Sequence, residues 1–308
     1  MLIDWHAHHT PPELGSAFER RGARPPRPDP FDSPDFSRRV AEMDAVGIDF
    51  QIVSQGAGVN ADRLPPADAI AIVRQSNDLI AERTSSHRDR LAGSIAFTWV
   101  NPIESAAEIR RMAAAGFRAV MMYGRGDVMG DPAVEPVFRA ISEVGLPVFL
   151  HGGAAAAAKD PTLERLEDAG QGVVVSASAD AAVSDCVVRM IAAGLFDRYP
   201  HLQVVIRSSG GGIPLLLSKL WWKHKGPGGE ERYADVLLRH FSVDCASAQP
   251  RTLRFLLDTL GADRVVFGSD YCGGLGPLAK ALPVINEQPD PSQITRAMER
   301  NSRALLHL

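Results

Sequence analysis

The chain has 308 residues, a formal net charge of −4 and 45% hydrophobic residues. This composition supplies a large buried core, and the absence of any block of like charges argues against a surface built for nucleic acid or anionic lipid. No stretch approaches the roughly 18 apolar residues of a membrane span, and no leader pattern opens the chain, so we expect a cytoplasmic protein with a small-molecule partner.

Short runs of β-forming residues recur along the chain, with helical patterns between them. The predicted strands cover residues 2–4, 50–54, 91–97, 119–122, 147–151, 204–207, 241–244 and 265–268. Most are apolar on both faces, which is typical of buried parallel strands. Eight strand–helix alternations predict a single-domain (β/α)8 barrel, or TIM barrel, over residues 1–308.

The segments between the strands show apolar residues at helical spacing and end at glycines. Phe36, Val40 and Met43 mark one such helix, which Gly47 follows. Glycine tolerates the left-handed backbone that commonly ends a helix. The same arrangement occurs before Gly116, Gly145 and Gly261.

Three segments interrupt the alternation, at residues 10–34, 152–178 and 221–232. The first two follow the first and fifth predicted strands at their carboxyl ends, where barrel enzymes build their active sites. We expect these insertions to form a substrate pocket or lid, with flexible surface loops as the alternative.

The first candidate metal ligands are His6 and His8. In a strand, residues i and i+2 point to the same side, so the two imidazoles can reach one ion. The pair alone is weak evidence, because short His-x-His runs also occur without a metal.

Two further predicted strands end in a possible ligand. His151 closes the fifth strand, and Gly152 and Gly153 leave space beside it. Asp270 follows the eighth strand, where a buried carboxylate requires a partner such as a cation. Three imidazoles and one carboxylate on one face of the barrel predict a single divalent metal, Zn²⁺ first, with Mn²⁺, Co²⁺ or Fe²⁺ as alternatives.

The longer motifs around these residues resemble a known family. They are IDWHAHHTPP at 3–12, EMDAVGID at 42–49, GLPVFLH at 145–151, DRVVFGSDY at 263–271 and NSRALL at 301–306. They are similar to the amidohydrolase superfamily, in the branch of aminocarboxymuconate-semialdehyde decarboxylase and γ-resorcylate decarboxylase, and the resemblance covers nearly the whole chain. It implies that His6, His8, His151 and Asp270 ligate one divalent metal, usually zinc or manganese, and that the protein is a homodimer.

One segment departs from the family pattern. Members that decarboxylate usually carry, after the sixth strand, a His followed by glycines and a proline, and this His is their general acid/base. Counting back from Pro214 places Ser208 at that position. A hydroxyl cannot exchange protons near neutrality as imidazole does, so the proton donor is missing or another group supplies it. Ser208 and Asp270 are the candidate catalytic residues.

Two more residues are candidates for substrate binding. Arg207 ends the sixth predicted strand and can bind a substrate carboxylate, or it can form an ion pair with a neighbouring acid. His9 follows the metal pair but points to the opposite face. It can pack behind the ligands, or it can serve the substrate as a replacement proton donor.

Three functions compete at this point. The first is non-oxidative decarboxylation of an aromatic or unsaturated carboxylic acid, with the metal and an arginine holding the substrate and Asp270 relaying a proton. The second is hydrolysis of an amide, a lactone or an activated carbon–carbon bond, with Asp270 as base, which does not require the missing His. The third is a catalytically silent binding protein.

Overall fold

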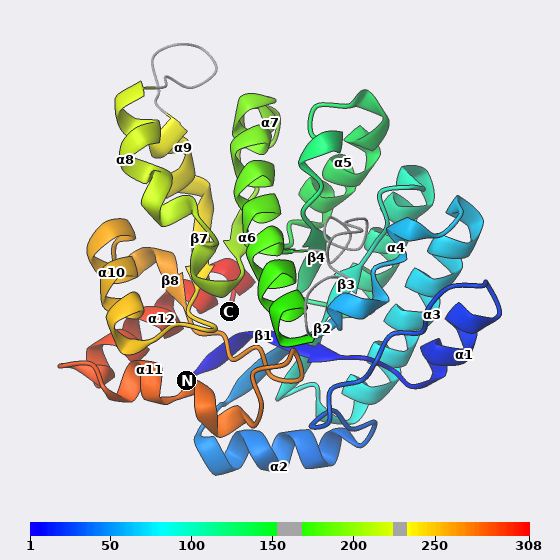
Figure 1. The fold of residues 1–308 in the computed structure, drawn as a ribbon, viewed down its shortest axis with the longest axis horizontal. Helices are drawn as coiled ribbons and strands as arrows, with labels where there is room; N and C mark the ends of the chain where they lie inside the picture. Colours follow the sequence, from blue (N-terminus) through cyan, green and yellow to red (C-terminus); the bar gives the residue numbers. More distant parts are fainter. Residues whose placement is uncertain (153–167, 224–232) are drawn as a thin grey trace.

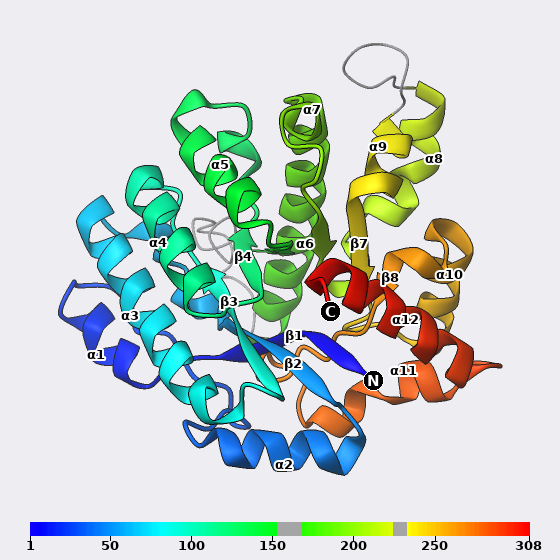
Figure 2. The ribbon, with the colours of Figure 1, turned by 180° about the vertical axis from the view of Figure 1, so that it is seen from behind.

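The computed structural model describes residues 1–152, 168–223 and 233–308. Its parallel strands pair in the order β1 to β8, with the helices around them (Figures 1 and 2). The strands are β1 (Ile3–His9), β2 (Phe50–Gln55), β3 (Leu91–Ala96), β4 (Ala119–Tyr123), β5 (Val148–His151), β6 (Val204–Ile206), β7 (Phe241–Asp244) and β8 (Val265–Val266). Bridges from Asp4 to Phe267 and from Ala7 to Tyr271 nearly close the barrel. The predicted (β/α)8 barrel is confirmed.

The helices alternate with the strands. They are α1 (Glu13–Glu19), α2 (Phe36–Val46), α3 (Pro66–Thr84), α4 (Pro102–Ala114), α5 (Glu135–Val144), α6 (Asp168–Ala192), α7 (Leu195–Arg198), α8 (Ile213–Lys223), α9 (Tyr233–His240), α10 (Pro250–Leu260), α11 (Pro283–Asn286) and α12 (Pro291–Leu306). Gly47 ends α2 and Gly145 ends α5, both with left-handed backbone as predicted. None of the helices in the described ranges has the length and apolar character needed to cross a bilayer.

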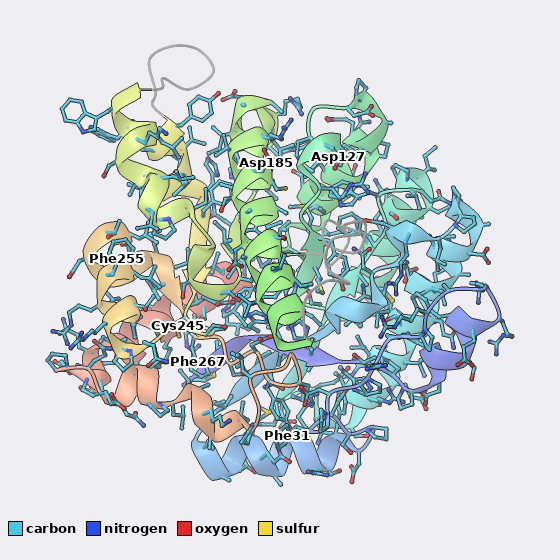
Figure 3. The ribbon with its side chains drawn as sticks, in the orientation of Figure 1. Phe31, Asp127, Asp185, Cys245, Phe255 and Phe267 are labelled. Carbon is cyan, nitrogen blue, oxygen red and sulfur yellow. The ribbon has the colours of Figure 1, made fainter. Side chains whose placement is uncertain are left out.

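The strands are buried on both faces, which explains their continuous apolar runs. One apolar cluster packs strand residues such as Trp5, Phe149 and Val205 against Leu305 and Leu306 of α12. A larger cluster fills the space between the strands and the surrounding helices. Figure 3 shows the contrast between Phe267, which is buried near the strands, and Phe255, which lies on the outer helix α10 and is 39% exposed.

The insertions differ in part from their prediction. Residues 10–34 contain the short helix α1, and residues 153–167 and 224–232 lie outside the described ranges. Residues 168–178, predicted as part of a loop, instead form the first half of α6. The reason is visible further along this helix, where Ala179, Val183 and Val187 recur at helical spacing and are buried.

Candidate metal centre

Four side chains from three parts of the barrel converge at its carboxyl end. His6 and His8 lie on β1, His151 ends β5, and Asp270 follows β8. One ligand atom from each lies within 4.8 Å of the others. The three imidazoles are buried, with side chains at most about 2% exposed. These are the residues that the sequence analysis proposed as ligands.

Backbone carbonyls orient two of the imidazoles. His8 Nδ1 lies 3.1 Å from the carbonyl oxygen of Gln55, and His151 Nδ1 lies 2.8 Å from that of Gly152. A carbonyl oxygen can only accept a hydrogen bond, so Nδ1 carries the proton in both rings. In this tautomer each ring directs Nε2, with its lone pair, toward the centre.

A buried carboxylate orients the third imidazole. His6 Nδ1 donates to Asp244 Oδ2 at 2.8 Å, and both side chains are fully buried. The other oxygen, Oδ1, accepts from the backbone N–H of Ser208 and of Ala246. Asp244 at the end of β7 therefore holds His6 with Nε2 directed at the other ligands, as carboxylates commonly do beside a metal-bound imidazole.

The donor atoms fit a cation between them. His6 Nε2 and His8 Nε2 are 3.1 Å apart, and Asp270 Oδ1 lies 3.1 Å from the first and 3.2 Å from the second. With both Nδ1 atoms already protonated, two lone pairs and a carboxylate oxygen face one another. This arrangement is repulsive unless a positive charge occupies the space, and three nitrogens with one oxygen suit a single divalent metal.

The ionisation of the side chains also indicates that a positive charge is needed between these donor atoms. Burial alone would lower the pKa of His6, but the Asp244 and Asp270 carboxylates raise it to about 10. Burial would raise the pKa of Asp270, but His6 and His8 hold it well below its usual range. Burial, and then the charge of Arg207, lowers the pKa of His151 well below its usual range. Without a metal, a proton on His6 thus supplies the positive charge beside the Asp270 carboxylate, and a divalent ion on the same donors would take its place.

A pocket of about 240 Å³ opens beside these donors. Its wall includes His8, His151 and Asp270, together with Arg207 and Cys272. Arg207 Nη2 donates to Asp180 Oδ1 of α6 at 3.0 Å. Its Nε is buried and has no hydrogen-bond partner within the described residues. Arg207 therefore forms the ion pair that was one alternative and still has a donor free for a ligand.

Two glycines give the ligands room, and the sequence analysis missed both. A Cβ at Gly273 would overlap Asp270 Oδ1 and lie 2.8 Å from the His8 ring. A Cβ at Gly268 would lie 2.9 Å from Asp244 and from the Cβ of His6. Their only sequence signal is that they flank Asp270.

His9 lies behind the centre. Its Nδ1 donates to Asp32 Oδ1 at 2.7 Å, its Nε2 accepts from Arg83, and its ring packs on Phe36. Burial lowers the pKa of His9. The ring is thus neutral with both nitrogens engaged, and it is not part of the described pocket wall. This placement favours the packing role over a contact with substrate.

Ser208 begins the turn after β6, with a left-handed backbone at φ 48. It is not among the described residues that line the pocket. The interaction that links Ser208 to the centre is made by its backbone, through the hydrogen bond to Asp244. The structure therefore gives its hydroxyl no contact with the proposed ligands.

We accordingly expect Ser208→Ala to reduce kcat/KM by roughly tenfold or less, because a neutral hydroxyl contributes about 0.5–1.5 kcal/mol to an interaction. The backbone N–H that binds Asp244 is retained in this variant. Steady-state kinetics on the true substrate, with the metal content measured in parallel, provide the test. A loss of 10²-fold or more with the metal still bound would show that the hydroxyl takes part in proton transfer.

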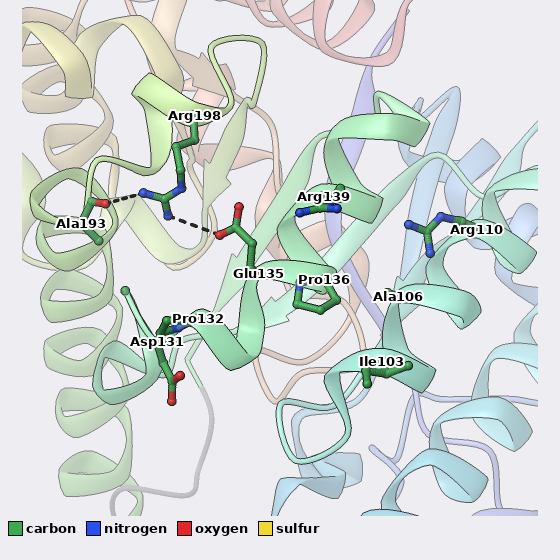
Figure 4. Close-up of a pocket in the computed structure, with 11 residues that line it drawn as sticks. Ile103, Ala106, Arg110, Asp131, Pro132, Glu135, Pro136, Arg139, Ala193 and Arg198 are labelled. Atoms are coloured by element: carbon green, nitrogen blue, oxygen red, sulfur yellow. Dashed lines mark hydrogen bonds and ion pairs between the residues drawn. The ribbon is translucent and has the colours of Figure 1, made fainter.

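A larger cavity lies away from this centre. It has a volume of about 800 Å³ and is lined by residues of α4, α5 and α7 (Figure 4). Its charged groups are largely paired, since Arg198 contacts Glu135 and Arg110 contacts Glu143. It offers no convergent donors comparable to those at the barrel mouth, so its size does not make it the candidate site.

Comparisons with known proteins agree with this geometry. Residues 3–308 match the model of a family described as amidohydrolase. A γ-resorcylate decarboxylase of Rhodococcus jostii is 27% identical over 253 residues, which cover 76% of this chain and 76% of that protein. A 2-amino-3-carboxymuconate-6-semialdehyde decarboxylase of Dictyostelium discoideum is 25% identical over 250 residues, with 78% and 67% covered. The resemblance inferred from the motifs is confirmed.

A solved structure shares the fold. It is a 5-carboxyvanillate decarboxylase from Novosphingobium aromaticivorans, in complex with manganese and 4-hydroxy-3-methoxy-5-nitrobenzoic acid. It superposes with a TM-score of 0.81 at 21% identity, covering 100% of this chain and 96% of that one. At this identity the likeness establishes the barrel.

Proposed function

The chain belongs to the amidohydrolase family, and we propose that it is a metal-dependent decarboxylase that removes CO2 from an aromatic or unsaturated carboxylic acid without oxidation. The observation that carries this proposal is the convergence of His6, His8, His151 and Asp270 at a pocket that Arg207 also lines. The two relatives named above are decarboxylases, which supports the reaction class. A pocket of about 240 Å³ suits a substrate with a single ring.

Each side chain of the pocket has a separate role in the proposed decarboxylation. A divalent metal held by His6, His8, His151 and Asp270 would supply Lewis-acid chemistry. Arg207 donates from its guanidinium, which lines the pocket, to the substrate carboxylate or to an oxygen beside it. The carbon–carbon bond then breaks, its electron pair stays on the substrate carbon, and CO2 leaves. Asp270 relays a proton from solvent water to that carbon, where the new C–H bond forms.

We propose zinc as the ion, because three imidazoles and one carboxylate suit it. Manganese is the alternative, and the solved decarboxylase named above holds it. Both ions are therefore used to load the protein in the experiments below.

Hydrolysis remains the second candidate, and one observation favours it. The imidazoles in the described wall of the pocket, His8 and His151, are both proposed ligands. A decarboxylase needs a group that protonates carbon, and no additional imidazole of the described wall supplies one. A hydrolase needs water as nucleophile and a base, a role that Asp270 can fill.

A single assay distinguishes these functions. Protein loaded with Zn²⁺ or Mn²⁺ is offered γ-resorcylate, 5-carboxyvanillate, other hydroxybenzoic acids, and a panel of amides and lactones. We expect CO2 release together with the decarboxylated ring. Turnover of an amide or lactone without CO2 would establish the hydrolase instead. A protein that binds neither metal would fit the silent binding protein.

We expect Arg207→Ala to raise KM for the acid by about 10- to 100-fold, because a hydrogen bond to a charged group contributes about 1.5–3 kcal/mol. The matched control is Asp180→Asn, which removes the ion-pair partner of Arg207 but keeps its guanidinium. Its KM should change by less than about threefold. Equal KM values for Arg207→Ala and the parent protein would contradict the binding role.

We also propose that residues 1–308 form one domain and that the protein is a homodimer. The continuous sheet and its shared core support the single domain. The dimer rests on the family resemblance alone, and light scattering at working concentration measures it.

A further inference from the structure

Asp4 is a buried acid that is not one of the four proposed ligands. Its side chain is fully buried, yet its two oxygens accept four hydrogen bonds. Oδ1 accepts from the backbone N–H of His6 at 3.1 Å and of Ser269 at 2.9 Å. Oδ2 accepts from the Ser269 hydroxyl at 2.6 Å and from Gln51 Nε2 at 2.7 Å. Two of these four donors belong to the residue before Asp270.

The junction between β8 and β1 explains why this contact matters. β8 contains only Val265 and Val266. Beyond it, Trp5 N–H donates to the carbonyl of Phe267, and His8 N–H donates to that of Tyr271. Between these two points the chain passes through Ser269 and Asp270. There the Asp4 side chain accepts two hydrogen bonds from Ser269, and the His6 carbonyl accepts a longer one, so that Ser269 is connected to β1.

The backbone of Asp270 gives such support a purpose. Its φ is +53, in the left-handed region, which aspartate adopts more readily than most residues but which still departs from strand geometry. The Ser269 hydroxyl spans this residue, since it donates to Asp4 and accepts from the backbone N–H of Tyr271 at 3.0 Å. The turn that carries Asp270 is thus tied on both sides to a single oxygen atom, which lies 2.6 Å from Asp4 Oδ2 and 3.2 Å from the His6 carbonyl oxygen. Asp4 makes the shorter of these two contacts.

We propose that Asp4 is a positioning residue for Asp270, acting through Ser269. The Asp4 carboxylate fixes the Ser269 hydroxyl and N–H, and these keep Asp270 in the conformation that directs Oδ1 at His6 and His8. The same strand then supplies two ligands and the group that aligns a further one. The inference rests on the proposed metal site. In it, Asp4 and Ser269 support metal binding without contacting the metal themselves.

The test measures metal affinity in the full-length protein, with Zn²⁺ or Mn²⁺ in competition with a chelator. We expect Ser269→Ala to weaken binding by about 10- to 100-fold, the usual effect of losing a group that orients a ligand. The matched control is Ser94→Ala, which removes a buried barrel hydroxyl that has no hydrogen-bond partner in the described structure. Its dissociation constant should stay within about twofold of the parent value.

A double-mutant cycle tests whether Asp4 acts on Asp270 through Ser269. If Asp4 acts through Ser269, Asp4→Asn combined with Ser269→Ala should weaken binding no more than the stronger single change. The proposal would be overturned if the double variant lost metal affinity by the product of the two single losses. It would also be overturned if a folded Ser269→Ala protein bound metal as tightly as the parent. If Ser269→Ala does not fold, Ser269→Thr, which keeps the hydroxyl, must bind the metal within about threefold of the parent, and a tenfold loss would overturn it. A parent protein without metal affinity would instead refute the metal site itself.

Discussion

An Asp270→Asn variant should fold as the parent protein does, yet lose most of its metal and at least roughly 10³-fold in kcat/KM, which corresponds to about 4 kcal/mol. Asparagine has the same shape and tolerates the left-handed backbone at this position, where φ is +53. The substitution therefore changes the charge and the proton-carrying capacity of this side chain and leaves its shape unchanged. It removes the negative ligand 3.1 Å from His6 Nε2 and the group proposed to carry the proton.

Asp185→Asn is the matched control for this prediction. Asp185 lies on α6 (Figure 3) and pairs with Arg189, with both side chains about half exposed. An exposed pair of this kind contributes little, so metal content and kcat/KM should match those of the parent. The measurements are elemental analysis, chelator competition and steady-state kinetics. An Asp270→Asn protein that keeps its metal and stays within tenfold in kcat/KM would show that the site has been assigned to the wrong acid.

The convergence of the four proposed ligands could be predicted largely because strand geometry places them. Strand alternation puts His6 and His8 on one side of β1, and a parallel barrel brings the carboxyl ends of its strands to one face. His151 follows from that rule as soon as its strand is recognised. Asp270 lies beyond β8 in a turn with φ +53, and its prediction depends instead on the need of a buried carboxylate for a cation. The four side chains do converge, within 4.8 Å. Local sequence thus suffices for residues whose direction the strand dictates.

The supporting residues depend on contacts between distant parts of the chain. Asp244 is visible in the sequence as an acid that ends an apolar run, but its partner His6 lies 238 positions away. Asp4 and Ser269 are separated by 265 positions. No periodicity specifies which buried acid meets which donor, because that depends on how the barrel closes. These residues could be noticed from sequence, but their roles could not be assigned.

Irregular backbone limits prediction in a similar way. Ser208 was placed by counting back from Pro214, yet its φ of 48 and that of Ser209 at 63 turn the chain away from strand geometry. Alternation gives no side-chain direction in such a turn. For Arg207, which directly follows β6, the sequence is compatible with two roles. The structure shows its ion pair with Asp180 and its place in the pocket wall together.

Gly273→Ala should weaken metal binding by roughly 10²-fold or more, although residue 273 is neither a ligand nor a proposed catalytic group. Its Cβ would overlap Asp270 Oδ1 and lie 2.7 Å from Asp270 Cγ and 2.8 Å from His8 Cδ2. Asp270 must then move, and a donor atom displaced by more than about 0.2 Å no longer lies at the distance that a bound metal requires. Gly273 does not have a positive φ, so the effect comes from the added methyl group and not from backbone strain.

Gly172→Ala provides the matched control, because it adds the same methyl group on α6 with no atom within 4 Å. This variant should keep the parent's metal affinity and gain slightly in helix stability. Chelator competition gives the metal dissociation constants of the two variants, which are then compared. Thermal unfolding of the metal-free proteins measures the stability of each variant separately. If Gly273→Ala binds metal as tightly as Gly172→Ala, the loop after Asp270 yields to the methyl group, and Asp270 is held by its own turn and not by the space that Gly273 leaves.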